Sequence, residues 1–212
     1  QCLPVGEEAS MAEAACAEPL AVALHANNMA GDVAGKRVLV TGAGPIGALC
    51  AAVAAHRGAR EVVVTDLQDL PLEVVRKMGA TRTLNAARDA AEIEAYAADK
   101  GYFHIVFECT AAGPAIKAGV AALRPQGRFV QVGVQGDTPV PLNMIVGKEI
   151  TIQGTHRFVE EFNEAVEIIR TRAIDVRPVV TGSFGLSDAL EAFDAASDRS
   201  RAVKVQIRFG GA

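Results

Sequence analysis

A glycine cluster between two apolar runs constrains the fold of this chain more than any other feature. Residues 36–42 form a short apolar run, residues 42–47 read GAGPIG, and residues 61–66 form a second apolar run that ends in an acid. Between them, residues 45–57 place apolar side chains at the i, i+3, i+4, i+7 spacing of a helix. Because short apolar runs bounded by turn residues are typical of buried strands, the stretch predicts a strand–turn–helix–strand unit.

In this context the pattern GxGxxG predicts a dinucleotide-binding turn. The first glycine permits the tight turn, the second lets the backbone approach a pyrophosphate, and the third lets helix and strand pack closely. Asp66 lies 19 residues after the last glycine, where a carboxylate accepts hydrogen bonds from the adenosine ribose and repels a 2′-phosphate. The competing interpretation is a plain strand–helix link with glycine turns and an Asp cap. The candidate cofactor-binding residues here are Gly42, Gly44, Pro45, Ile46, Gly47 and Asp66.

The rest of the chain continues the alternation of strands and helices, which predicts an α/β fold with a doubly wound parallel sheet. Further strands are expected at 81–85, 104–110, 127–133, 149–155, 176–184 and 202–209. Further helices are expected at 18–30, 69–78, 89–99, 113–123, 158–170 and from a Ser187 cap to 197. Glu108 ends one of these strands and is expected to have a structural role.

Composition excludes several classes of function. The chain has 212 residues, a net charge of −4, 5% aromatic residues and no Trp, which argues against a nucleic-acid partner. No apolar run approaches the roughly 18 residues of a membrane span. The four cysteines are scattered without CxxC spacing, so neither a zinc ribbon nor a redox dithiol is predicted. The expected location is the cytoplasm, with no membrane partner.

Several segments resemble the zinc-dependent medium-chain dehydrogenases, in particular their polyol branch. Beside the GxGPxG form, the resemblance rests on EPLAVALHA (18–26), KGYFHIVFECT (100–110), GRFVQVGV (127–134) and GKEITIQGTHRFVEEFNEAV (147–166). The resemblance implies the end of a β-rich GroES-like catalytic domain at 1–17, a Rossmann domain at 18–156 and a return to the catalytic domain at 157–212. It also implies a C-terminal fragment without the cysteine and the His-Glu pair of the family's zinc site, and therefore inactive alone.

The family pattern carries over to three places in this chain. Glu18 matches an acid that approaches the zinc; by itself it is a carboxylate in a first helical turn, where the dipole favours it. Two loops match the nicotinamide side of the cofactor site, although a strand-end turn and a solvated arginine are the plain alternatives. The residues of these loops are Val132, Gly133 and Val134, then Thr155, His156 and Arg157.

One departure from the family favours NAD over NADP. Sorbitol dehydrogenases carry an arginine shortly after the ribose-binding acid, whereas this chain has Pro71 there and no base between Asp66 and Arg76. In the intact enzyme, zinc and NAD would oxidise a small polyol or aldonate, at the C5 hydroxyl of L-idonate or at the C2 hydroxyl of a polyol. The resemblance also implies a homodimer or homotetramer. Two alternatives stay open: a dinucleotide-binding module without chemistry, and a zinc-free reductase of the same superfamily.

Overall fold

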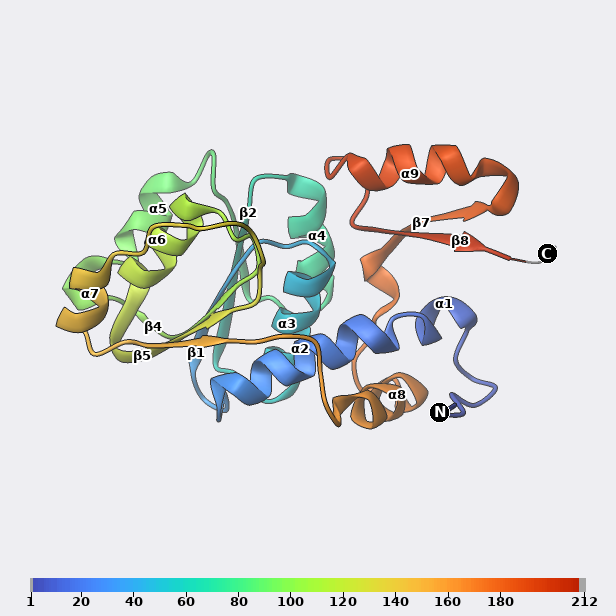
Figure 1. Ribbon diagram of the computed structural model, residues 1–212, viewed down its shortest axis with the longest axis horizontal. Coiled ribbons are helices and arrows are strands. Elements are labelled where there is room, and N and C mark those ends of the chain that lie inside the picture. The colour runs from blue at the N-terminus through green and yellow to red at the C-terminus, as the bar shows by residue number, and fades with distance from the viewer. Residues whose placement is uncertain (1, 210–212) are drawn as a thin grey trace.

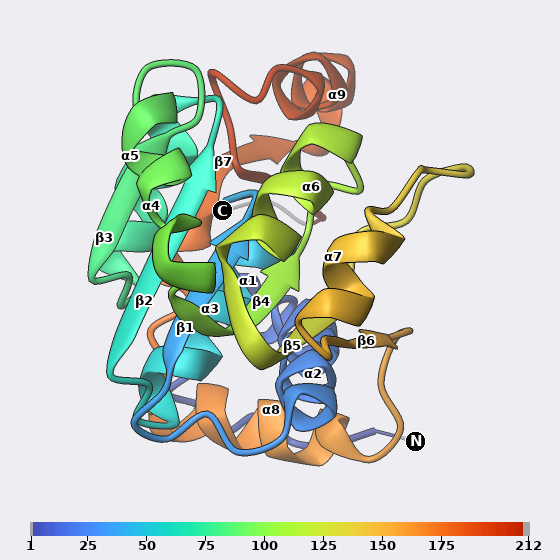
Figure 2. The same cartoon turned by 90° about the vertical axis from the view of Figure 1, so that its left-hand side faces the viewer.

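The computed structural model describes residues 2–209. Within them, six parallel strands form one sheet in the order β3-β2-β1-β4-β5-β6. Figure 1 shows the whole chain, and Figure 2 labels the six strands in this order. The strands are β1 (Arg37–Thr41), β2 (Glu61–Asp66), β3 (Arg82–Asn85), β4 (Phe103–Glu108), β5 (Leu123–Gln131) and β6 (Thr151–Gly154). The order reverses direction between β1 and β4, which is where open α/β sheets bind ligands.

Helices cover both faces of the sheet, as expected for a doubly wound fold. The helices of the described chain are α1 (Met11–Ala14), α2 (Ala17–Ala30), α3 (Pro45–His56), α4 (Asp69–Lys77), α5 (Ala90–Ala95), α6 (Gly113–Ala122), α7 (Leu142–Gly147), α8 (Glu161–Thr171) and α9 (Ala189–Ser197). Short 3-10 turns lie at Ala98–Lys100, Arg177–Val179 and Leu186–Asp188. No helix among residues 2–209 is long and apolar enough to cross a membrane.

The alternation of side chains along β1 shows the two layers. Val38 and Val40 pack into a core formed with α2, α3, α4 and α8. Leu39 points the other way, into a smaller core with α6 and parts of α5 and α7. Helices α5, α6 and α7 lie nearest the viewer in Figure 2. Residues 47–54 of α3 are all buried, which fits a helix that is apolar on every side.

The C-terminal part forms a second, smaller unit. Strand β7 (Val180–Gly185) pairs in parallel with β8 (Lys204–Arg208), and α9 packs on both strands. Helix α8 lies beside α2, so the C-terminal segment returns to the N-terminal helix (Figures 1 and 2). The expected boundaries at 17/18 and 156/157 stay predictions.

Several local expectations were wrong or incomplete. Ser187 does not cap α9: it lies inside the 3-10 turn that runs directly into the helix, and its Oγ donates to Asp188 Oδ1 at 3.2 Å. Helix α7 was not predicted; Met144 and Ile145 of this six-residue helix pack against the smaller core, while Leu142 and Val146 are exposed. The strand expected at 176–184 begins at Val180, after a 3-10 turn, and the helix expected at 89–99 ends at Ala95. In the sheet, β5 begins at Leu123 rather than at 127.

Candidate functional site: a dinucleotide cleft at the carboxyl edge of the sheet

The glycine loop, residues 42–47, joins β1 to α3 at the carboxyl edge of the sheet. Gly42 has a φ of +89°, which residues with a side chain rarely adopt. A Cβ on Gly47 would lie 1.8 Å from the carbonyl oxygen of Gly42, so only glycine lets α3 begin this close to β1. Gly44 is the N-cap residue of α3 and Pro45 follows it, with no side chain capping the helix. The free N–H groups of the first turn therefore remain for an external anion.

Asp66 holds the glycine loop from the end of the neighbouring strand β2. Its Oδ2 accepts from the N–H of Ala43 at 2.7 Å, and its Oδ1 accepts from the N–H of Gln68 at 3.0 Å. The side chain is only 3% exposed. Two backbone N–H donors thus fix the orientation of the Asp66 carboxylate, which is predicted to bind the ribose. The carboxylate lies beside the glycine loop, which is predicted to bind the pyrophosphate.

A cavity of about 590 Å³ opens at this point, and we call it the β1–β2 cavity. Its walls are mainly apolar and include Leu67, Ile93 and Pro114, and Gly42 and Asp66 also line it. Small-molecule sites combine such apolar walls with a few fixed polar groups. The lining suits a mostly apolar ring attached to a polar sugar.

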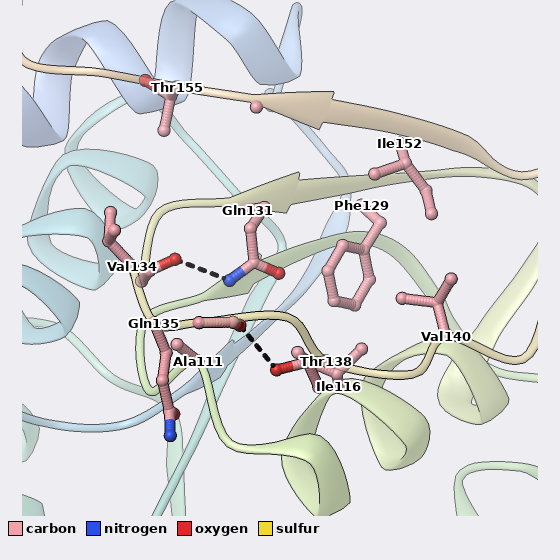
Figure 3. A pocket seen from close by; sticks show the side chains of 13 residues that line it. Ala111, Ile116, Phe129, Gln131, Val134, Gln135, Thr138, Val140, Ile152 and Thr155 are labelled. Carbon is pink, nitrogen blue, oxygen red and sulfur yellow. Dashed lines mark hydrogen bonds between the residues drawn. The ribbon is translucent and has the colours of Figure 1, made fainter.

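A second cavity, the β5–β6 cavity, has a volume of about 400 Å³ and lies on the other side of the strand reversal. Figure 3 shows Phe129 and Gln131 from β5, Ile152 from β6, and Val134 from the loop after β5 around it. Thr155 also lines it, and its Oγ1 is buried without a hydrogen-bond partner among the described residues. Such a hydroxyl is a candidate contact for a ligand group.

The buried carboxylate of Glu108 organises the loop between the two cavities. Oε2 accepts from the N–H of Ala111 and from Gln131 Nε2, both at 2.7 Å. Oε1 accepts from the N–H of Thr110 at 2.9 Å, from the Thr110 hydroxyl, and from Thr41 Oγ1 at 3.2 Å. Ala111 faces the β5–β6 cavity, whereas Thr110 faces the β1–β2 cavity. The structural role expected for Glu108 is therefore to shape both cavities.

The thiol of Cys109 lies behind the glycine loop and is not suited to act as a nucleophile. A hydrogen bond with Cys50, burial, and the charge of Glu108 raise the pKa of Cys109 well above its usual range. Its Cβ would be 3.5 Å from a Cβ on Gly47. A neutral thiol in this place contributes packing.

The structure brings together only part of the predicted nicotinamide-side set. Gly133, Val134 and Thr155 line the β5–β6 cavity, whereas Val132, His156 and Arg157 do not. Val132 packs against the main core, and His156 and Arg157 are exposed. Ile46, from the glycine loop, also packs against the main core. Their roles in cofactor binding stay predictions.

The described residues do not form a zinc site by themselves. Among residues 2–209 no group of three or more His, Cys, Asp or Glu side chains is placed to share a metal ion. Glu18 is exposed in the first turn of α2, as its sequence position suggested. Because a protein zinc site takes three or four such ligands, Glu18 could only complete a site whose other ligands come from elsewhere.

The structure adds one site residue that the sequence analysis missed. Arg199, from the loop between α9 and β8, lines the β1–β2 cavity, and its Nη2 lies 2.7 Å from Asp66 Oδ2. The two residues are 133 positions apart. No local pattern links them, because the contact depends on how the C-terminal unit returns to the sheet.

Comparison with known proteins agrees with this geometry. A family model described as zinc-binding dehydrogenase matches residues 45–171. L-Idonate 5-dehydrogenase (NAD(P)(+)) of Escherichia coli K12 is 36% identical over 210 residues, which are 99% of this chain and 61% of that protein. Human sorbitol dehydrogenase is 35% identical over 199 residues, covering 91% of this chain and 55% of that protein. The crystal structure of the E. coli L-idonate 5-dehydrogenase matches with a TM-score of 0.94, over 99% of this chain and 60% of that one.

This chain thus spans about three fifths of the length of such relatives. The region matched by the family model begins at Pro45, at the end of the glycine loop, and includes Asp66, Glu108 and the residues that line the β5–β6 cavity. The resemblance to the polyol branch is confirmed at the level of the family. The chain belongs to the zinc-binding dehydrogenase family.

Proposed function

We propose that this chain binds NAD(H) across the strand reversal between β1 and β4. The adenosine half would occupy the β1–β2 cavity with its ribose hydroxyls on Asp66. The pyrophosphate would lie on the first turn of α3, and the nicotinamide half would enter the β5–β6 cavity beside Val134 and Thr155. The observation that carries this proposal is the glycine loop held against Asp66 by the 2.7 Å bond from Ala43, beside a largely apolar cavity that Gly42 and Asp66 line.

The two cavities complement the two halves of a dinucleotide. The apolar walls around Ile93 and Pro114 suit an adenine ring, and the buried Asp66 suits the hydroxyls of its ribose. The anion falls where α3 offers uncapped N–H groups. The loop held by Glu108 lies between the cavities, so it would contact the middle of the bound cofactor.

We further propose that the protein containing this chain is a polyol or aldonate dehydrogenase. The first candidate activity is that of an L-idonate 5-dehydrogenase, which oxidises L-idonate to 5-keto-D-gluconate and passes the hydride to NAD. The alternative is the C2 oxidation of sorbitol or L-iditol. The names of relatives at 35–36% identity support both. In such an enzyme zinc would polarise the reacting hydroxyl, while this chain's residues bind and orient the cofactor.

A substrate comparison tests this activity. The protein would be supplied with NAD and either L-idonate, sorbitol or D-gluconate, and NADH formation would be followed by its absorbance. The account expects turnover with L-idonate or sorbitol and none with D-gluconate beyond background. No NADH from L-idonate or sorbitol, in a protein that binds NADH, would refute the proposed substrate class and leave the binding proposal standing.

The assembly of the protein stays a prediction. Strand β6 is at the edge of the sheet, and its Ile152 is 43% exposed. An edge strand with an exposed apolar side chain is a natural place for strand pairing between subunits. A homodimer or homotetramer formed through this edge would give the corresponding mass in sedimentation equilibrium.

A further inference from the structure

Arg199 is the only basic residue that lines the β1–β2 cavity in the described part of the chain. It reaches the cavity from the C-terminal unit and forms an ion pair with Asp66, at 2.7 Å between Nη2 and Oδ2. The carboxylate beneath is 3% exposed, whereas the Arg199 side chain is 54% exposed. The acid is therefore buried while the guanidinium paired with it stays accessible, and both line the same cavity.

We propose that Arg199 is a specificity-determining residue that lets this site accept the 2′-phosphate of NADP(H) as well as the free ribose of NAD(H). The proposal rests on the proposed dinucleotide binding described above. It reverses one sequence-based expectation, since the absence of a base between Asp66 and Arg76 favoured NAD alone. The required cation comes instead from a loop distant in sequence.

The charges explain why one site can accept both ribose forms. An unpaired Asp66 would repel a 2′-phosphate, but Arg199 compensates its charge at direct contact distance. A guanidinium carries five N–H donors, and the hydrogen bond to Asp66 is the one that Arg199 makes within residues 2–209. The remaining donors are available to a phosphate. With NAD(H), Asp66 Oδ1, which accepts only from the N–H of Gln68 within residues 2–209, keeps a lone pair for a ribose hydroxyl.

The guanidinium touches the ribose-binding acid and also lies close to the pyrophosphate turn. Arg199 Nη2 is 2.7 Å from Asp66 Oδ2, and a Cβ on Gly44 would be 3.7 Å from the same atom. A phosphate on the ribose 2′-oxygen, beside Asp66, is therefore within reach of Arg199, and a comparison of fragments with and without that phosphate separates this contact from one with the pyrophosphate. The loop is also held in shape, because the side chain of Asp198 accepts from the N–H and the hydroxyl of Ser200 at 2.9 and 2.6 Å. Arg199 thus lies between two anchored neighbours.

Adenosine fragments test this inference without zinc, substrate or nicotinamide. The dissociation constants of 5′-AMP and 2′,5′-ADP would be measured by titration calorimetry for the wild-type chain and for Arg199→Ala, Arg199→Lys and Arg201→Ala. Arg201 is exposed in the same loop and forms no ion pair in the described structure, so its variant removes the same charge without touching Asp66. Binding of 5′-AMP reports that each variant is folded.

The expected result is a selective loss. Arg199→Ala should weaken 2′,5′-ADP by about 10- to 100-fold, as for removal of hydrogen bonds to a charged group, and change 5′-AMP much less. Arg199→Lys should keep part of the 2′,5′-ADP affinity, and Arg201→Ala should behave like the wild type. Equal losses for both ligands in Arg199→Ala, or a wild type that binds 5′-AMP but not 2′,5′-ADP, would overturn the inference alone. A wild type that binds neither ligand would refute the proposed dinucleotide binding as well.

Discussion

Replacing Glu108 with glutamine should destabilise the chain although the shape of the side chain hardly changes. All the partners of Glu108 are donors, and an amide can accept on only one side. If the amide NH₂ takes the place of Oε2, it faces the N–H of Ala111 and the amide of Gln131. If it takes the place of Oε1, the hydroxyls of Thr41 and Thr110 can rotate, but the N–H of Thr110 cannot. At least one buried backbone donor is therefore left unsatisfied, which costs about 1–3 kcal/mol.

Urea unfolding followed by circular dichroism would measure this loss for Glu108→Gln. Glu73→Gln is the matched control, because Glu73 is exposed on α4 and its substitution should change the free energy of unfolding by about 0.5 kcal/mol or less. If Glu108→Gln and the control have the same urea midpoint and the same dependence of the unfolding free energy on urea concentration, no buried donor is left unsatisfied and the prediction is wrong.

Two further predictions concern the glycine loop and pH. Gly47→Ala should abolish NADH binding and destabilise the fold by about 1–3 kcal/mol, because the new Cβ would meet the Gly42 carbonyl oxygen at 1.8 Å. The control is Gly147→Ala: a Cβ on Gly147 has open space around it, so NADH titrations of this variant should match those of the wild type. Burial opposes ionisation of Glu161, but hydrogen bonds from His25 and from backbone and amide donors outweigh it and lower its pKa to about 2 from the usual 4.5. The folded-state pKa is the lower one, so this contribution to stability is present above pH 4.5 and is lost as the pH falls toward 2. Between pH 4.5 and 2, the urea midpoint of Glu161→Gln should fall less than that of the wild type. Equal falls in the two midpoints would contradict a lowered pKa of Glu161 in the folded state.

The sequence predicted the sheet and the glycine loop well because their determinants are local. The run before Gly42 and the run ending at Asp66 are both short, apolar and bounded by turns, and each is a strand in the structure. The glycine spacing marks positions where a side chain would meet backbone, as Gly47 shows directly. Such signals depend on a few neighbouring residues.

The missed features depend on contacts between distant parts of the chain. Arg199 reaches Asp66 only because the C-terminal unit returns to the carboxyl edge of the sheet, and nothing in the residues around it marks this contact. Glu108 could be assigned a structural role from its strand end, but its partners in the loop after β4 and at the end of β5 become visible only in the folded chain. The cap expected at Ser187 was wrong for a local reason. Serine is a common N-cap residue, but here it lies inside a 3-10 turn that the sequence pattern did not indicate.

The most direct test of the central claim is an equilibrium titration of this chain with NADH. The chain contains no Trp, so the fluorescence of the nicotinamide can be followed without protein emission from that residue. The account predicts saturable binding with a dissociation constant between about 1 μM and 1 mM, and displacement of NADH by 5′-AMP from the β1–β2 cavity. Fluorescence that rises without saturation, or NADH that 5′-AMP does not displace, would contradict the proposed cofactor site.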